Sequence, residues 1–252
     1  LRYWKFCSME AFYANNTMEL GKKMSGILYG IGVGPGDPEL ITLKSLRLIE
    51  SAEIIAYPKL EGSESFARKI VECFIESTKT EIAIEIPMSE KRLPAQKAYD
   101  AAAKKISKYL KDNKDVVVLC EGDPFFYGSF MYLHSRLSDH YQTEIIPGVS
   151  SLTTCAAVTN RPLTARNEVL VVLPGPLEEK ELKRRLSDSN SAAIMKVGRH
   201  LKKIRRVIDE LGLTEFAYYV ERASLKEQKV LTLVDAPENA PYFSMILLTK
   251  GN

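Results

Sequence analysis

The feature that most constrains this chain is the glycine-rich stretch from Gly30 to Glu39. A short apolar run leads into it, and apolar residues at helical spacing follow it over 40–49. The order of strand, glycine turn and helix is typical of an open α/β sheet, in which ligands bind at the carboxyl ends of the strands. Glycines let the backbone approach a ligand closely, and Pro35 stiffens the turn. A tight turn without a ligand is the competing interpretation.

The spacing of these glycines excludes the common nucleotide-binding motifs. A dinucleotide fingerprint needs glycines at i, i+2 and i+5. From Gly30 the i+5 residue is Pro35, and from Gly32 it is an aspartate. A P-loop needs Gly-Lys followed by Ser or Thr, which this stretch lacks. Because Asp37 and Glu39 would also repel a phosphate, we expect the loop to face a neutral or cationic ligand.

Runs of β-type residues alternate with helical patterns as far as residue 146. The expected strands are 27–33, 53–57, 80–86, 115–120 and 142–146, and the expected helices are 42–51, 63–74, 93–110 and 127–138. Pro58 is expected to stop the second strand, and Ser63 to cap the helix that follows. This alternation predicts a largely parallel sheet covered by helices on both faces.

A turn-rich break at 147–151 separates this region from a second set of elements. Helices are expected at 152–158, 179–186 and 201–211, and strands at 168–173, 192–197, 216–220, 229–234 and 243–249. The last three strands lack intervening helices, which predicts a mixed sheet. We therefore expect two α/β domains, 24–146 and 147–252. Residues 1–23 are expected to form a loosely ordered extension, with a docked amphipathic helix as the alternative.

The composition argues against several classes of function. The four cysteines and three histidines are scattered, and no Cys-x-x-Cys pair occurs, so neither a zinc site nor a disulfide framework is expected. No apolar run is long enough to span a membrane, and a net charge of +3 does not by itself indicate nucleic acid. Reduced thiols and the absence of a recognisable secretory signal favour the cytoplasm.

Two later turns, 121–124 and 147–151, also follow expected strands, as the stretch 30–38 does. Because the carboxyl ends of parallel strands meet at one edge of a sheet, we expect the three turns to lie together. Asp123 places a carboxylate at a helix entry, and the aromatic residues 125–127 add flat surface beside it. The alternative is that Asp123 is only an N-cap and that the aromatic side chains belong to the core.

Taken together, these motifs resemble those of the tetrapyrrole (class III) methyltransferases. The matching segments, spread over 26–250, are Gly32–Thr42, Gly122–Pro124, Pro147–Ser151 and Arg161–Thr164. Three further features resemble the branch that methylates precorrin-2 or cobalt-factor II at C-20 in cobalamin biosynthesis. They are Tyr57–Lys59, the double serine Ser150–Ser151 and Pro241–Ser244. Siroheme-forming, diphthamide-forming and ribosomal-RNA ribose methyltransferases share the general motifs.

The resemblance implies two α/β domains, with mixed, largely parallel sheets, that hold S-adenosyl-L-methionine in the cleft between them. It also implies a homodimer, a small-molecule tetrapyrrole substrate, no metal site, and no nucleic-acid or membrane partner. The implied cofactor contacts are Pro35, Glu121, Gly122, Asp123, Phe126, Ser150, Ser151, Met195 and Ala223. Ala223 stands where some relatives carry glycine. Methyl transfer is an in-line displacement in which alignment contributes up to about 7–11 kcal/mol, and no residue stands out as a catalytic base.

A flat macrocycle that bears carboxylates needs cationic partners. The candidate substrate residues are Asp37, Lys59, Arg161 and Arg166, and Lys91–Arg92 lies on the same kind of loop. Arginine suits bidentate contacts with carboxylates, although most loop cations are simply solvated. For Asp37 we favour a helix cap over a role at the reacting centre.

The basic runs 183–185 and 199–206 lie on helical patterns and are expected to be solvated faces. An RNA ribose methyltransferase would use such runs, so methylation of RNA stays open as an alternative. Methylation at another corrin position and a tetrapyrrole carrier that has lost cofactor binding are further alternatives. Binding of S-adenosylmethionine separates the carrier from the enzymes, and strongly salt-dependent RNA binding would identify the RNA class.

Overall fold

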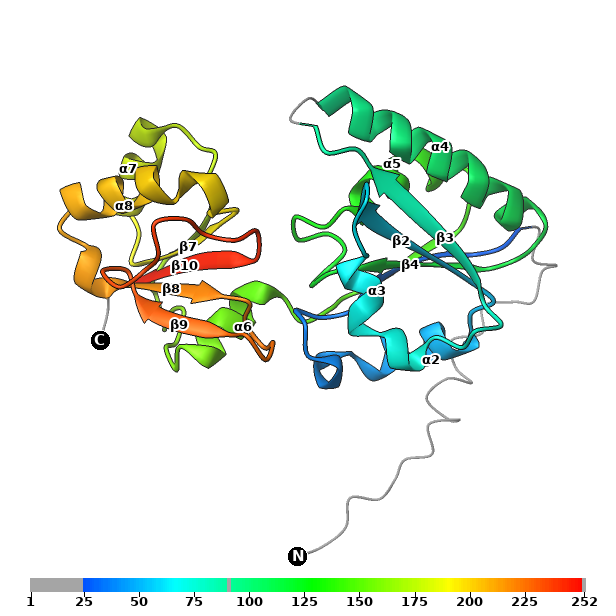
Figure 1. Ribbon diagram of the computed structural model, residues 1–252, viewed down its shortest axis with the longest axis horizontal. Coiled ribbons are helices and arrows are strands. Elements are labelled where there is room, and N and C mark those ends of the chain that lie inside the picture. The colour runs from blue at the N-terminus through cyan, green and yellow to red at the C-terminus, as the bar shows by residue number, and fades with distance from the viewer. Residues whose placement is uncertain (1–24, 90–91, 251–252) are drawn as a thin grey trace, which may run out of the picture.

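The computed structural model describes residues 25–89 and 92–250, which form an α/β protein with two five-stranded sheets (Figure 1). The expectations for residues 1–23, for Lys91 and for the Arg92 side chain lie outside this described part. Within it, no helix has both the length and the apolar character needed to span a membrane.

The elements follow the predicted alternation, with short 3-10 helices labelled η. The first half contains β1 (Leu28–Gly32), η1 (Pro38–Leu40), α2 (Leu43–Ser51), β2 (Ile54–Leu60), α3 (Phe66–Ile70), η2 (Glu72–Phe74), β3 (Thr80–Ile86), α4 (Arg92–Lys111), β4 (Val116–Cys120), α5 (Phe130–Leu137) and β5 (Thr143–Ile146). The second half contains α6 (Ser151–Val158), β6 (Leu170–Pro174), α7 (Glu179–Ser187), β7 (Ser191–Met195), η3 (Gly198–His200), α8 (Leu201–Glu210), η4 (Thr214–Phe216), β8 (Ala217–Glu221), β9 (Lys229–Thr232) and β10 (Ser244–Thr249).

The first sheet is parallel throughout, in the order β3-β2-β4-β1-β5. All five residues of β4 are buried, as expected of a continuous apolar strand inside a parallel sheet. Helices α4 and α5 pack on one face, and α2 and α3 pack on the other (Figure 1). The prediction of a parallel sheet covered on both faces is therefore confirmed.

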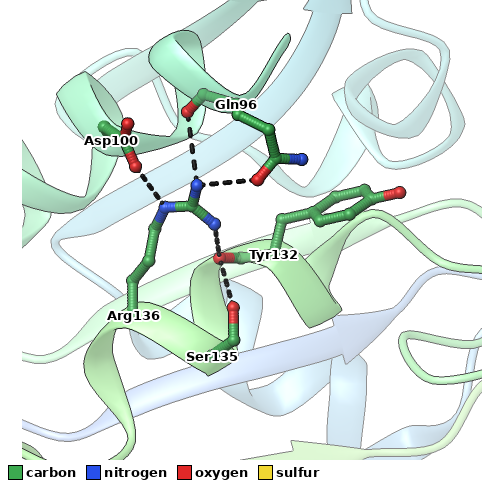
Figure 2. Close-up of polar contacts among 5 residues, drawn as sticks. All are labelled: Gln96, Asp100, Tyr132, Ser135 and Arg136. Atoms are coloured by element: carbon green, nitrogen blue, oxygen red, sulfur yellow. Dashed lines mark hydrogen bonds and ion pairs between the residues drawn. The ribbon is translucent and has the colours of Figure 1, made fainter. Parts of the chain in front are cut away.

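A polar cluster around Arg136 fixes α5 against α4 (Figure 2). Its Nε donates to Asp100 Oδ1 at 2.7 Å, and one terminal nitrogen donates to the Tyr132 carbonyl oxygen at 2.7 Å. The other terminal nitrogen donates to Gln96 Oε1 at 2.9 Å. The Ser135 hydroxyl donates to the same Tyr132 oxygen at 3.1 Å. Since the guanidinium donates to groups on both helices, it links their exposed edges above the apolar core.

The second sheet is mixed, in the order β6-β7-β10-β8-β9, which confirms the prediction. Strands β6 and β7 are parallel, whereas β10 runs antiparallel to both of its neighbours, β7 and β8. Helices α7 and α8 cover one face, and α6 packs on the other face beside β10 (Figure 1). Helix α6 thus packs on the second sheet, and the division into domains 24–146 and 147–252 stays a prediction.

Pro58 does not stop β2, contrary to the sequence expectation. The strand continues to Leu60, and its pairing with β3 also extends to Leu60. On the other side, β4 pairs only with Ile54–Ala56. Beyond that point one edge of β2 has no ladder partner, and proline can occupy such an edge position because it lacks an N–H to donate.

The expected helix over 63–74 is shorter and is capped by a different serine. Ser65 caps α3, because its Oγ accepts a hydrogen bond from the Arg68 N–H at 3.3 Å. Ser63 instead donates its hydroxyl to the Leu60 carbonyl oxygen at 2.9 Å, which closes the turn after β2. The helix ends at Ile70, and a 3-10 turn follows.

Candidate cofactor and substrate site

The carboxyl ends of β1, β4 and β5 meet at closely packed glycines. Gly122 donates its N–H to the Gly34 carbonyl oxygen at 2.8 Å, and Gly34 donates back at 3.4 Å. A Cβ added to Gly148 would lie 2.1 Å from the Gly122 carbonyl oxygen and 2.8 Å from the Gly32 Cα. Only glycine permits so close an approach between backbones. The predicted clustering of the three turns is confirmed.

The carboxylate of Asp123 holds two of these turns together. Its Oδ1 accepts hydrogen bonds from the N–H groups of Phe125 at 2.9 Å and Phe126 at 3.1 Å. Its Oδ2 accepts from the Gly148 N–H at 3.1 Å. Asp123 therefore caps a local turn rather than α5. The helix expected from Tyr127 begins only at Phe130, because this aspartate-centred turn occupies the intervening residues.

Asp37 caps the short helix η1. Its carboxylate accepts a hydrogen bond from the Glu39 N–H at 2.9 Å, so Asp37 has a capping role, but the expected helix over 42–51 is capped by Thr42 instead. The Asp37 N–H donates to the Ser224 hydroxyl at 3.2 Å. Ser224 belongs to the loop that follows β8 in the second half of the chain. The glycine turn is therefore attached to the second sheet.

A cavity of about 230 Å³ lies at this junction and is lined by residues from both halves of the chain. All nine residues expected to contact a cofactor line it. They are Pro35, Glu121, Gly122, Asp123, Phe126, Ser150, Ser151, Met195 and Ala223. Several lining residues were missed, among them Phe66, Lys196 and Arg222. Tyr242 and Phe243 also line the cavity; their segment, Pro241–Ser244, was recognised as a motif but not as part of the site. Lys196 and Arg222 directly follow β7 and β8, so the rule that picked out the first three turns could have found them.

Two aromatic rings join the two halves beside the cavity. The ring centroids of Phe66, from α3, and Phe243, from the segment before β10, lie 4.4 Å apart. Tyr242 contacts Phe243 edge-on at 5.0 Å and is 78% exposed. Tyr127, on the other side, is 42% exposed. Exposed flat rings therefore border the cavity, and they are not part of the core.

The cavity has a carboxylate side and a cationic side. Glu121 and Asp123 come from the first half, and Lys196 and Arg222 come from the second. Burial raises the pKa of the Glu121 carboxyl, and backbone hydrogen bonding, including that of Ala67, opposes this only in part. A cationic group beside Glu121 would favour its ionised form. This arrangement suits a ligand that carries both positive and negative charge.

The candidate substrate residues do not line this cavity. Lys59 pairs with Glu85 at 2.9 Å, and Arg166 is exposed on the loop after α6. Arg161 donates to the Tyr218 hydroxyl at 2.6 Å, and its guanidinium carbon lies 4.1 Å from the centroid of that ring. Asp37 lies beside the cavity without lining it. Contact of these four residues with a substrate stays a prediction.

The chain is similar to known methyltransferases over most of its length. Residues 27–236 match the family of tetrapyrrole (corrin/porphyrin) methylases. The chain is 40% identical over 238 residues to a precorrin-2 C(20)-methyltransferase from Sinorhizobium sp, which covers 89% of this chain and 97% of that protein. It is 29% identical over 232 residues to the cobalt-precorrin-2 C(20)-methyltransferase of Salmonella typhimurium, covering 90% of this chain and 98% of that protein.

A solved structure shows the same fold. The uroporphyrin-III C-methyl transferase from Thermus thermophilus, in complex with S-adenyl homocysteine, matches with a TM-score of 0.64. The alignment covers 88% of this chain and 97% of that one, at 22% identity. At this identity the likeness concerns the arrangement of helices and strands.

Proposed function

Because the chain belongs to the tetrapyrrole (corrin/porphyrin) methylase family, we propose that it transfers a methyl group from S-adenosylmethionine to C-20 of precorrin-2 or cobalt-factor II, in cobalamin biosynthesis. The observation that carries this proposal is the single cavity that all nine expected cofactor residues line. The acceptor follows from the relatives. Identity is 40% to the enzyme named for precorrin-2 and 29% to the one named for its cobalt form, so metal-free precorrin-2 is the acceptor to test first.

The lining of the cavity fits S-adenosylmethionine. When bound, this cofactor supplies a methyl group activated on a positively charged sulfonium. The Glu121 carboxylate lies where it would favour a cationic group. The rings and thioether of Phe126 and Met195 provide apolar walls, and Ser151 offers a hydroxyl at the start of α6. The solved relative in complex with S-adenyl homocysteine supports the same cofactor here.

Alignment of the reactants is the contribution that these residues make to catalysis. Asp123 acts as a positioning residue, since its carboxylate is bonded to three backbone N–H groups at the cavity wall. Cys155 also lines the cavity, but burial raises the pKa of its thiol to about 12. A thiolate nucleophile is therefore not available at neutral pH. We therefore propose that the methyl group passes directly from the donor to the acceptor. Alignment of the two reactants contributes up to about 7–11 kcal/mol to lowering the barrier.

The basic runs on α7 and α8 do not favour the RNA alternative. Their cations pair with carboxylates of the same two helices. The pairs are Lys183–Glu210, Arg184–Glu181, Arg185–Glu181 and Arg206–Glu179. Arg205 donates instead to carbonyl oxygens of the segment after β9. Four cations of these helices are therefore already paired with carboxylates, as is typical of a solvated face rather than of a phosphate-binding surface.

A homodimer and a cytoplasmic location complete the proposal. Free cysteines at positions 73, 120 and 155 are in keeping with a reducing compartment. Light scattering of the purified protein measures the mass of the assembly. Fractionation of cells that produce the protein measures its location.

The experiment that tests the function is an assay with purified protein, S-adenosylmethionine and precorrin-2, repeated with cobalt-factor II. We expect a product that is one methyl group heavier, with one equivalent of S-adenosylhomocysteine, and a higher rate with the metal-free acceptor. Unchanged acceptor, under conditions in which a control methylase modifies its own substrate, would contradict the proposal. Calorimetry with S-adenosylhomocysteine separates an inactive carrier, which would not bind it, from an enzyme acting on another acceptor.

A further inference from the structure

Two cations emerge at one edge of the second sheet, from the two strands on either side of β10. Lys196 is the first residue after β7, and Arg222 is the first residue after β8. Both strands run antiparallel to β10, which lies between them, so their carboxyl ends point the same way. Met195 pairs with Met245, and Glu221 pairs with Ser244. The two cations therefore flank the start of β10 on the cavity wall.

The backbone at both positions adopts a conformation that these residue types rarely take. Lys196 has φ of 55° and Arg222 has φ of 51°, both in the left-handed region. Tyr127, on the opposite wall, has φ of 58°. Such residues cost free energy and concentrate at functional sites. Lys196, Arg222 and Tyr127 all line the same cavity.

Surrounding contacts fix the Lys196 side chain and the Arg222 backbone at the cavity. The Lys196 ammonium lies 5.1 Å from the centroid of the Tyr127 ring, so it reaches across toward the first half of the chain. Arg222 donates its N–H to the Phe243 carbonyl oxygen at 2.9 Å, and its own carbonyl oxygen accepts from Leu225. Ser224, two residues on, accepts the hydrogen bond from Asp37. The loop that carries Arg222 is therefore fixed from both sides.

Neither cation is neutralised within the described part of the chain. No carboxylate there lies within ion-pair distance of Lys196 or Arg222, and both residues are exposed. This distinguishes them from Lys59, which pairs with Glu85, and from Arg68, which pairs with Glu81 at 2.6 Å. Of the two carboxylates in the cavity, Asp123 already accepts three hydrogen bonds from the backbone. Two cations on one cavity wall, neither with a counter-ion among the described residues, favour an anionic ligand.

The exposed aromatic rings indicate what kind of anion this is. Tyr127, Tyr242 and Phe243 are 42%, 78% and 37% exposed, and all three line the cavity. Flat rings beside a pair of cations suit a planar ligand with carboxylates at its rim. We propose that Lys196 and Arg222 bind a side-chain carboxylate of the acceptor macrocycle and thereby set its orientation toward the methyl donor. This inference rests on the proposed function, because it names the part of that site which holds the acceptor.

The test uses variants that remove each charge and keep the aliphatic stem. In Lys196→Met, Arg222→Met and the double variant, the backbone strain is unchanged, so the fold is expected to be retained. Two ligands are used. Binding of uroporphyrin III, a porphyrin whose side chains all end in carboxylates, is measured by fluorescence quenching. Binding of S-adenosylhomocysteine is measured by calorimetry. Lys226→Met is the matched control, since this exposed lysine lies in the same loop as Arg222 but does not line the cavity.

We expect each single variant to weaken uroporphyrin III binding about tenfold, while the S-adenosylhomocysteine affinity stays within about twofold of the wild type. The control should bind both ligands as the wild type does. A variant Lys196→Gly relieves the left-handed backbone and should therefore raise the melting temperature while it loses porphyrin affinity. A residue that only supports the fold would not show a higher melting temperature together with a lower porphyrin affinity.

Three results would overturn the assignment. They are unchanged uroporphyrin III binding in both single variants, a loss of S-adenosylhomocysteine affinity equal to the loss of porphyrin affinity, or no porphyrin binding to the wild-type protein. Failure of the proposed function gives a different result. In that case the wild type would not methylate precorrin-2, whereas the charge-dependent porphyrin binding would persist.

Discussion

The carboxylate of Asp123 accepts a hydrogen bond from the Gly148 N–H at 3.1 Å and so connects the turn after β4 to the turn after β5. The other oxygen of the same carboxylate accepts two N–H groups of its own turn. These turns form one wall of the cavity between the sheets. The shape of this wall therefore depends on one carboxylate side chain that accepts hydrogen bonds from three backbone N–H groups.

Replacing Asp123 with Asn should damage both stability and cofactor binding. An amide offers one oxygen and a nitrogen that itself donates, so at least one of the three backbone donors loses its acceptor. We expect the free energy of unfolding to fall by about 1–3 kcal/mol and S-adenosylhomocysteine to bind about tenfold more weakly. Urea unfolding and calorimetry measure the two effects. Asp112→Asn, at an exposed position, is the control. Full stability combined with lost affinity would mean that Asp123 contacts the ligand directly.

The Gly148→Ala substitution should disrupt the site through a backbone clash. The added Cβ would lie 2.1 Å from the Gly122 carbonyl oxygen, and neither backbone can yield without moving a cavity turn. We expect S-adenosylhomocysteine affinity to fall at least about tenfold. Gly62→Ala serves as the control, because no atom lies within 4 Å of the added Cβ and its φ of 74° limits the cost to local backbone strain. The control should lose about 1 kcal/mol of stability and no affinity. Equal effects of the two substitutions on affinity would contradict the close-packing account.

Glu121→Gln should stabilise the protein in a pH-dependent way. Burial raises the pKa of the folded-state carboxyl, so folding favours its protonated form. In the wild type this penalty is absent in acid, grows as the pH rises from the unfolded-state pKa through the folded-state pKa, and is constant above it. The variant should therefore be more stable than wild type at neutral pH and equal to it below about pH 4. It should also bind S-adenosylmethionine more weakly. Parallel pH profiles of unfolding free energy for the two proteins would contradict this.

Arg136→Met should destabilise the packing of α5 on α4. The substitution leaves the Gln96 and Tyr132 carbonyl oxygens and the Asp100 carboxylate without this donor. We expect a loss of about 1–3 kcal/mol in unfolding free energy, with S-adenosylhomocysteine affinity unchanged within about twofold. Arg184→Met is the matched control, since that arginine forms only an exposed pair with Glu181 and should lose less than about 0.5 kcal/mol. A stability loss no larger than that of the control would show that the cluster in Figure 2 does not support the fold.

The sequence pattern predicted the elements that depend on local signals. The continuous apolar run Val116–Cys120 marks a buried parallel strand, and the turn after it is marked by its glycine and proline. What it could not predict depends on tertiary partners. Pro58 is tolerated in β2 because the pairing of β2 with β4 ends at Ala56. The residues of β2 alone do not reveal where its neighbour stops pairing.

The residues of the cavity also divide into those with a local sequence signal and those that depend on tertiary contacts. The nine residues expected to contact the cofactor all line the cavity, whereas the four candidate substrate residues do not. The contact of Phe66 with Phe243 was missed because it joins segments from opposite ends of the chain. The strand ends before Lys196 and Arg222 were a usable signal for these two residues. Their residue types gave none, since lysine and arginine, unlike glycine, do not mark a left-handed backbone.

The most direct measurement of the central claim is the position of the transferred methyl group. Precorrin-2 is incubated with the protein and with S-adenosylmethionine labelled with ¹³C in the methyl group, and the product is examined by NMR. The account predicts a single labelled methyl group on the C-20 meso carbon, in place of its hydrogen, together with one equivalent of S-adenosylhomocysteine. Label at another carbon of the macrocycle, or none on the macrocycle at all, would contradict it.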